Sequence, residues 1–142
     1  MTDYLEFKKT GTDSQFMLLQ VTGGNACIQA VSRIYVTSQM MADLHQELSG
    51  FLQEQDLEGY WENDVPGIGG PPCVTLRFLP QDTCGHVLLE IYMELNDGGD
   101  FGSHNCRFYI HTDRALLKGF MEGLEEFMTP TDGEVLRLSG TV

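Results

Sequence analysis

Two short motifs combine cysteine and histidine at a spacing that metal ligands use on a β-strand. They are CGH at 84–86 and HNC at 104–106. Alternate residues of a strand point to the same face, so each motif could present one thiolate and one imidazole to a zinc ion. Buried cysteines and surface histidines are the competing interpretation, because free cysteine behaves as a small apolar residue.

The register of the intervening hairpin argues against one shared zinc site. The glycine-rich sequence around Gly98 predicts the turn between two strands. With this turn, His104 lies opposite Glu94 or Tyr92 and far from His86 along the ladder. The two motifs are therefore expected at opposite ends of the hairpin, and we predict no metal site.

The turn itself is acidic, with Asn96, Asp97 and Asp100. It lacks the alternating ligands and the terminal glutamate of an EF-hand calcium loop. A hairpin turn is the simpler explanation of the DGG sequence.

The motifs of common enzymes are missing from the sequence. There is no Gly-x-Ser-x-Gly elbow and no P-loop, and the prolines of GIGGPP forbid the helix that a dinucleotide fingerprint requires. A Cys106–His111 couple is conceivable, but nothing singles it out. We therefore expect a protein that is not an enzyme and needs no cofactor.

Charge is the strongest bulk property of the chain. It has 21 acidic and 8 basic residues, a formal net charge of −13. No lysine or arginine occurs between Arg33 and Arg77, or between Arg77 and Arg107. Nucleic acids and anionic membranes are poor partners for such a surface, whereas a basic protein would be attracted and steered. A general role of the acids in solubility is the competing explanation.

The sequence DLEGYWENDV places two aromatic residues, Tyr60 and Trp61, among acids. Aromatic anchors surrounded by charge are typical of interface hot spots. Alternatively, Trp61 folds back onto the sheet as part of the core. Together with the acidic turn, this sequence gives the predicted partner-binding residues: Glu54, Asp56, Glu58, Tyr60, Trp61, Glu62, Asp64, Asp97, Asp100 and Phe101.

Two amphipathic helices are predicted to position this surface. Apolar residues recur at one helical face in 40–52 and, with the same spacing, in 116–128. Thr37 and Ser38 can cap the first helix, Thr112 and Asp113 the second, and Pro130 follows the second. The shared spacing suggests either an internal duplication or two quasi-equivalent halves.

Alternating β-branched and aromatic residues predict strands before each helix. They lie at 4–8, 15–22, 26–36, 74–79, 86–94 and 106–112, with a short edge strand within 133–140. We predict one α+β domain over 1–142: an antiparallel β-sheet with two amphipathic helices packed on one face. It consists of two βββα-like halves, 1–54 and 73–142, joined by a long loop at 55–72.

The sequence also predicts a cytoplasmic protein. It contains no apolar run long enough for a bilayer and does not start like a signal peptide. The four cysteines are then expected to be reduced.

The segment GHVLLEIYMELNDGGDFGSHNCRFYIHTDRALLKGFMEGLEEFM, residues 85–128, resembles the C-terminal part of WapI-type immunity proteins of bacterial polymorphic toxin systems. The shared features are a long strand beginning GHV, a polar turn, a strand ending in TD, and a helix with Leu117, Phe120 and Leu124. The resemblance covers about a third of the chain. It implies a non-enzymatic inhibitor that binds a toxin, often a basic nuclease, and blocks its active site.

Two other functions remain open at this point. One is a small acidic secretion-type chaperone or adaptor with an adaptable surface rich in methionine: Met40, Met41, Met93, Met121 and Met128. The other is a metal protein or enzyme that uses the cysteines and histidines. The sequence does not decide between monomer and dimer.

Overall fold

A computed structural model describes residues 2–12, 16–53, 58–63, 73–95, 104–129 and 134–141. Within these ranges it contains two helices, α1 (Ser38–Gln53) and α2 (Arg114–Phe127). The eight strands are β1 (Tyr4–Thr12), β2 (Met17–Gly24), β3 (Gln29–Val36), β4 (Gly59–Glu62), β5 (Val74–Pro80), β6 (His86–Glu94), β7 (Asn105–Asp113) and β8 (Val135–Ser139).

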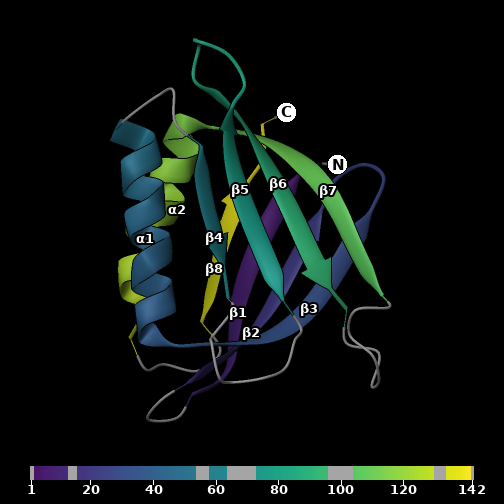
Figure 1. The fold of residues 1–142 in the computed structure, drawn as a ribbon, viewed down its shortest axis with the longest axis vertical. Helices are drawn as coiled ribbons and strands as arrows, with labels where there is room; N and C mark the ends of the chain where they lie inside the picture. Colours follow the sequence, from purple (N-terminus) through teal and green to yellow (C-terminus); the bar gives the residue numbers. More distant parts are fainter. Residues whose placement is uncertain are drawn as a thin grey trace.

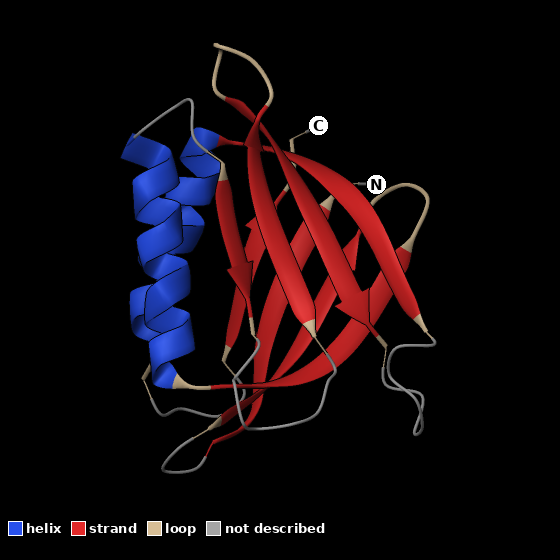
Figure 2. Ribbon diagram, in the orientation of Figure 1, coloured by secondary structure: helices blue, strands red, loops and turns tan. Residues whose placement is uncertain are grey.

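The strands form two four-stranded antiparallel sheets. Sheet A has the order β3-β2-β1-β8 and sheet B the order β4-β5-β6-β7. The two helices lie side by side along one flank, where α1 adjoins β4 and α2 adjoins β8 (Figures 1 and 2). The predicted α+β class with antiparallel strands and two helices is confirmed. The division of the strands into two sheets was not indicated by the sequence.

The two halves of the chain have the same order of elements. Three antiparallel strands, a helix and a short strand occur in β1–β4 with α1, and again in β5–β8 with α2. Each short strand joins the sheet of the other half, since β4 pairs with β5 and β8 pairs with β1. The repeated helix pattern in the sequence thus corresponds to the same position in two quasi-equivalent halves.

Both helices begin with caps that the sequence predicted. The Thr37 hydroxyl accepts a hydrogen bond from the backbone N–H of Met40 at 3.1 Å. The Asp113 carboxylate accepts one from the N–H of Leu116 at 2.8 Å. Each cap satisfies an amide group that the first helical turn leaves unpaired.

One hydrophobic core joins the two sheets and both helices. The ring of Phe7 on β1 is at its centre, with ring-centroid distances of 5.6 Å to Phe120 and 6.4 Å to both Trp61 and Phe127. The contacts bring together residues from β1, β4 and α2, which are distant in the sequence. The same core therefore fixes the position of β4 relative to the helices.

The segment predicted as a loop at 55–72 contains a strand. Gly59–Glu62 pairs with β5, with Trp61 opposite Leu76 and Tyr60 opposite Arg77. Four residues give too short an alternation to stand out from a loop in sequence, and the pairing with β5 is what defines the strand. The predicted edge strand at the C-terminal end is confirmed as β8.

Among the described residues, neither helix is long and apolar enough to cross a membrane.

Candidate functional site

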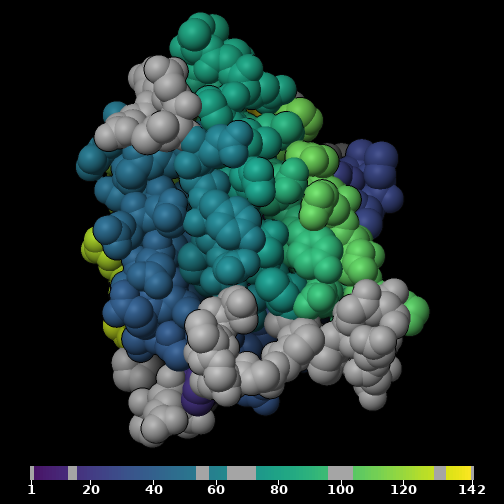
Figure 3. All heavy atoms as spheres, in the orientation of Figure 1, coloured from purple at the N-terminus to yellow at the C-terminus, as the bar shows by residue number. Residues whose placement is uncertain are grey.

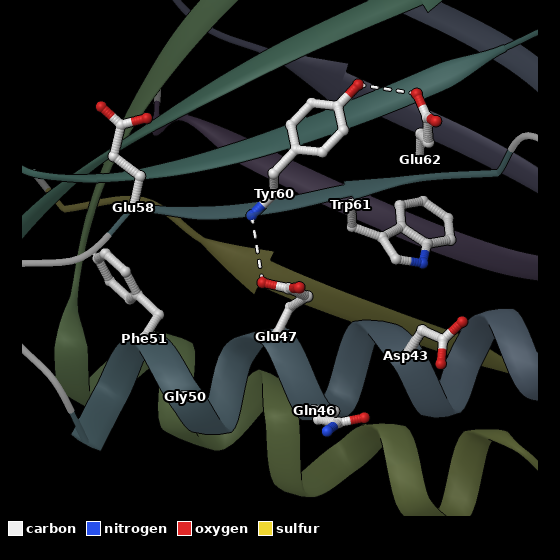
Figure 4. A pocket seen from close by; sticks show the side chains of 9 residues that line it. All are labelled: Asp43, Gln46, Glu47, Gly50, Phe51, Glu58, Tyr60, Trp61 and Glu62. Carbon is white, nitrogen blue, oxygen red and sulfur yellow. Dashed lines mark hydrogen bonds between the residues drawn. The ribbon is translucent and has the colours of Figure 1, made fainter.

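A groove of about 610 Å³ lies between α1 and β4 (Figure 4). Asp43 and Glu47 point from α1 toward β4, and Trp61 points from β4 toward α1 (Figure 4). Helix and strand lie side by side on one face, which continues over the other strands of sheet B (Figure 3). The described lining residues are Asp43, Gln46, Glu47, Gly50, Phe51, Glu58, Tyr60, Trp61 and Glu62.

The groove is strongly acidic. None of its described lining residues is a lysine or arginine. Four of them carry a carboxylate: Asp43, Glu47, Glu58 and Glu62. A cation borders it from β5, where the Arg77 guanidinium is 3.6 Å from the Glu58 carboxylate. Both side chains of this pair are substantially exposed, so water weakens the attraction and the groove keeps a negative potential.

Tyr60 forms the exposed aromatic part of the groove, with 42% of its surface accessible. Its hydroxyl donates a hydrogen bond to Glu62 at 2.8 Å, and its backbone N–H points to Glu47 at 3.5 Å. Partial burial, followed by the hydrogen bond to the Glu62 carboxylate, raises the pKa of Tyr60 to about 12. The phenol therefore remains neutral and remains a donor at physiological pH.

Trp61 forms the buried floor of the groove. Only 3% of its surface is accessible, and its indole N–H donates to the backbone carbonyl of Met40 at 2.8 Å. Burial and a satisfied N–H identify a core residue that ties β4 to the start of α1. The structure thus favours the second of the two interpretations of Trp61, and Tyr60 is the exposed aromatic residue of the groove.

Four of the predicted partner-binding residues meet at this groove: Glu58, Tyr60, Trp61 and Glu62. The other six lie outside the described residues: Glu54, Asp56, Asp64, Asp97, Asp100 and Phe101. The sequence analysis missed the α1 side of the groove. Asp43, Glu47 and Gly50 have the i, i+4, i+7 spacing of one helical face, which was the available signal.

A comparison of the two halves explains why the groove forms at α1. Glu47 and Gly123 are equivalent, each preceding a buried leucine of its helix. A Cβ atom at Gly123 would be 2.6 Å from Leu136, so α2 lies directly on β8. Opposite α1, β4 has Trp61 where β8 has Leu136, since Trp61 pairs with Leu76 of β5 as Leu136 pairs with Phe7 of β1. A Cβ atom at Gly50 would meet nothing within 4 Å. The larger residues Glu47 and Trp61 therefore stand where the other half has the close contact of Gly123 with Leu136, and the carboxylate-lined groove lies on the α1 side.

The cysteine and histidine motifs are separated, as the hairpin register predicted. His86 pairs with Asp113 at one end of the β6–β7 ladder, and the carbonyl of His104 accepts from the Leu95 N–H at 2.7 Å at the other end. Within the described residues, no group of three or more histidine, cysteine, aspartate or glutamate side chains is placed to hold a metal ion.

The CGH motif belongs to a structured turn. The Asp82 carboxylate accepts hydrogen bonds from the backbone N–H of Cys84 at 2.8 Å and of His86 at 3.2 Å. It also lies 2.5 Å from the His86 ring nitrogen Nδ1, and this contact lowers the pKa of Asp82. These hydrogen bonds give Asp82 and His86 a structural role in the turn.

Cys106 and His111 do not form a catalytic couple. Both lie on β7, five residues apart, so their side chains leave opposite faces of the strand at a separation of roughly 16 Å. Burial also raises the pKa of the Cys106 thiol, which keeps it protonated.

Comparisons with protein-family models, characterised proteins and solved structures found no match to this chain.

Proposed function

We propose that this chain is a non-enzymatic binding protein that takes a basic segment of a partner protein into the groove between α1 and β4. The observation that carries the proposal is the lining of this groove: four carboxylates, no described lysine or arginine, and an exposed tyrosine. This combination favours a lysine or arginine side chain of a partner, because such a side chain can pair with the carboxylates and pack against the ring.

The geometry suits a side chain with a positively charged end and an apolar stem. The Asp43 and Glu47 side chains extend from α1 toward β4, whereas those of Glu58 and Glu62 extend away from α1 on the same side as the exposed Tyr60 ring (Figure 4). Arg77 already shows the type of contact, since its guanidinium lies 5.5 Å from the centre of the Tyr60 ring. A partner's basic side chain can approach the same ring and gain the carboxylates of α1 as well.

The resemblance of residues 85–128 to WapI-type immunity proteins supports a toxin as the partner. An immunity protein acts by occupying the toxin's active site, which requires affinity and shape but no chemistry of its own. A net charge of −13 would accelerate encounter with a basic toxin and favour it over acidic proteins. We therefore propose that the partner is a basic protein toxin that this chain neutralises.

An acidic chaperone or adaptor is the second candidate. Its methionine argument is weakened, because Met40, Met41 and Met93 are buried in the core, and Met121 and Met128 are half-buried against it. The adaptor would have to use other apolar surface. A salt gradient separates the candidates, since apolar binding depends little on ionic strength.

The test compares two double variants with the unmodified protein. Glu47→Gln with Glu58→Gln removes two charges from the groove. Glu122→Gln with Glu126→Gln removes two charges from exposed positions of α2 and serves as the control. The three proteins are immobilised, exposed to lysate of the source cell and eluted with a salt gradient, and the eluted proteins are identified by mass spectrometry.

We expect one basic protein that elutes from the groove variant at lower salt than from the control and the unmodified protein. Identical elution from all three proteins would contradict binding at this groove. Several unrelated proteins that resist salt would favour the adaptor.

A further inference from the structure

The carboxylates of the groove form two sets, which differ in whether a cation already accompanies them. The first set is Asp43 and Glu47, which extend from α1 toward β4 (Figure 4). Among the described residues, no lysine or arginine forms an ion pair with either of them. Their neighbours are neutral, since the Gln39 amide donates to Asp43 at 2.9 Å and the Tyr60 N–H points to Glu47 at 3.5 Å. This set therefore has two negative charges available to a cation.

The second set lies beside the exposed tyrosine and already has a cation next to it. Arg77 of β5 pairs with Tyr60 across the β4–β5 ladder. Its guanidinium is 3.6 Å from the Glu58 carboxylate and 5.5 Å from the centre of the Tyr60 ring. A partner's arginine would make the same two kinds of contact at this position. Arg77 is thus the protein's own counterion at this part of the site.

Arg77 is held weakly and has a second carboxylate within reach. Its side chain is 44% exposed and that of Glu58 is 59% exposed, so water competes with the ion pair. On the other side, the Arg77 Nε atom is 3.9 Å from Glu90, a carboxylate that is 17% exposed. Glu90 also accepts from the Tyr109 hydroxyl at 2.7 Å and lies 4.0 Å from Arg107. Arg77 can therefore move off the tyrosine ring and keep a carboxylate partner.

We infer that the site takes a pair of basic side chains from the partner. The first lies beside Asp43 and Glu47, where no charge has to be displaced. The second replaces Arg77 at Tyr60 and Glu58. This inference rests on the function proposed above and defines the segment that is bound, which has two neighbouring arginine or lysine residues.

Arg77 sets how much the second basic side chain contributes to binding. In the unmodified protein this side chain exchanges with Arg77, so the contacts that it gains are partly offset by those that Arg77 loses. Without Arg77, the same position has no resident cation, and the second side chain gains its contacts with Glu58 and the Tyr60 ring in full. The affinity gained from a second arginine therefore reports whether Arg77 is displaced.

The test uses two end-blocked glycine peptides that contain either one arginine or two adjacent arginines, with calorimetry at low ionic strength. In the unmodified protein we expect the two-arginine peptide to bind about threefold more tightly than the one-arginine peptide. In Arg77→Gln this ratio should rise to roughly tenfold, because a full ion pair and ring contact are gained. Lys118→Gln removes the same charge from an exposed position of α2 and should leave the ratio unchanged.

Nitrogen-15 NMR of the unmodified protein follows the displacement directly, even if Arg77→Gln does not fold. The Nε–H signal of Arg77 should shift on saturation with the two-arginine peptide and much less with the one-arginine peptide. Arg137 of β8 serves as the reference, because it forms an exposed ion pair with Glu6 on sheet A and has no contact with the groove. Its Nε–H signal should stay in place with both peptides.

The outcomes separate this inference from the proposed function. A folded Arg77→Gln variant with the same affinity ratio as Lys118→Gln, or an Arg77 signal that does not respond to the two-arginine peptide, would overturn the inference and leave binding at the groove standing. Failure of both peptides to bind the unmodified protein at millimolar concentration would contradict the proposed function together with the inference.

Discussion

Tyr60 and Trp61 are adjacent in the chain and have opposite environments because successive residues of a strand face opposite sides. Tyr60 is exposed beside the groove, and Trp61 is buried beneath it. The residue available for contact with a partner is therefore the phenol. The indole lies in the floor of the groove and ties β4 to α1 through its hydrogen bond to the Met40 carbonyl.

The raised pKa of Tyr60 gives a prediction for alkaline pH. Its folded-state pKa is about 12, above the ordinary value of roughly 10 that it has in the unfolded chain. The neutral phenol therefore contributes stability that is complete below pH ~10 and is lost as pH rises toward ~12. Titration of tyrosinate absorbance should show one tyrosine fewer at high pH in Tyr60→Phe.

Glu62→Gln refines this prediction. It should lower the pKa of Tyr60 without returning it to the ordinary value, because burial is the larger cause of the shift. An ordinary midpoint for Tyr60 in the unmodified protein would contradict the described contact.

Trp61→Ala should act on folding. Removal of a buried indole and its hydrogen bond to Met40 is expected to lower the free energy of unfolding by about 3–5 kcal/mol. Chemical denaturation measures this loss, and Tyr60→Ala in the same strand serves as the exposed control, with a loss of about 1 kcal/mol or less. Equal effects of the two substitutions would show that the indole is not part of the core.

At the scale of elements, the two helices each carry a glycine, and these glycines have different surroundings. Gly50 of α1 faces open space, whereas Gly123 of α2 adjoins Leu136 of β8. The difference gives a matched pair of substitutions, because glycine lowers helix stability at both positions.

Gly50→Ala should raise the free energy of unfolding by about 0.5–1 kcal/mol through helix propensity alone. Gly123→Ala should lose this gain, because its Cβ atom would displace Leu136. The double variant Gly123→Ala with Leu136→Ala relieves the clash, although it also loses the packing of the leucine. Denaturation of all three variants checks the pair, and an equal gain at both glycines would contradict the close approach of α2 and β8.

A buried charge links β1 to the segment between α2 and β8. The side chain of Lys9 is inaccessible to solvent and forms an ion pair with Glu134 at 3.0 Å. Its ammonium group also donates to the Thr129 carbonyl and lies 4.9 Å from the centre of the Phe127 ring. This lysine thus holds the C-terminal end of α2 against sheet A.

Lys9→Ala should lower the free energy of unfolding by about 3 kcal/mol or more, because it leaves Glu134 and a carbonyl without their partner. The control is Lys8→Ala, which removes the same side chain from an exposed neighbour. Thermal denaturation should show a large loss for Lys9 and a small one for Lys8. Similar melting temperatures would contradict the burial of Lys9.

At the scale of the whole molecule, the charge of −13 and the position of the groove predict how binding depends on salt. Once a basic partner is identified, its association rate constant should fall steeply as ionic strength rises. Glu47→Gln with Glu58→Gln should reduce this slope and accelerate dissociation. Stopped-flow measurements test the prediction, and rates that do not depend on salt would argue for apolar binding.

The sequence by itself determined the local structure of this protein. Helical periodicity and capping residues predicted α1 and α2, and alternation with turn signals predicted seven of the eight described strands. Turn position also fixed the β6–β7 register closely enough to separate the two cysteine–histidine motifs. These features depend on neighbours in the chain, so the sequence contains the information.

The tertiary structure decided how these elements combine. β4 is too short to be recognised without its pairing to β5, and the exchange of β4 and β8 between the halves is a long-range contact. The acidic residues at 58–62 were visible in sequence, but their meeting with Asp43 and Glu47 required α1 to lie beside β4. Glu47 and Trp61 stand at the groove where the other half has the contact of Gly123 with Leu136, and only packing in three dimensions brings that difference to one place.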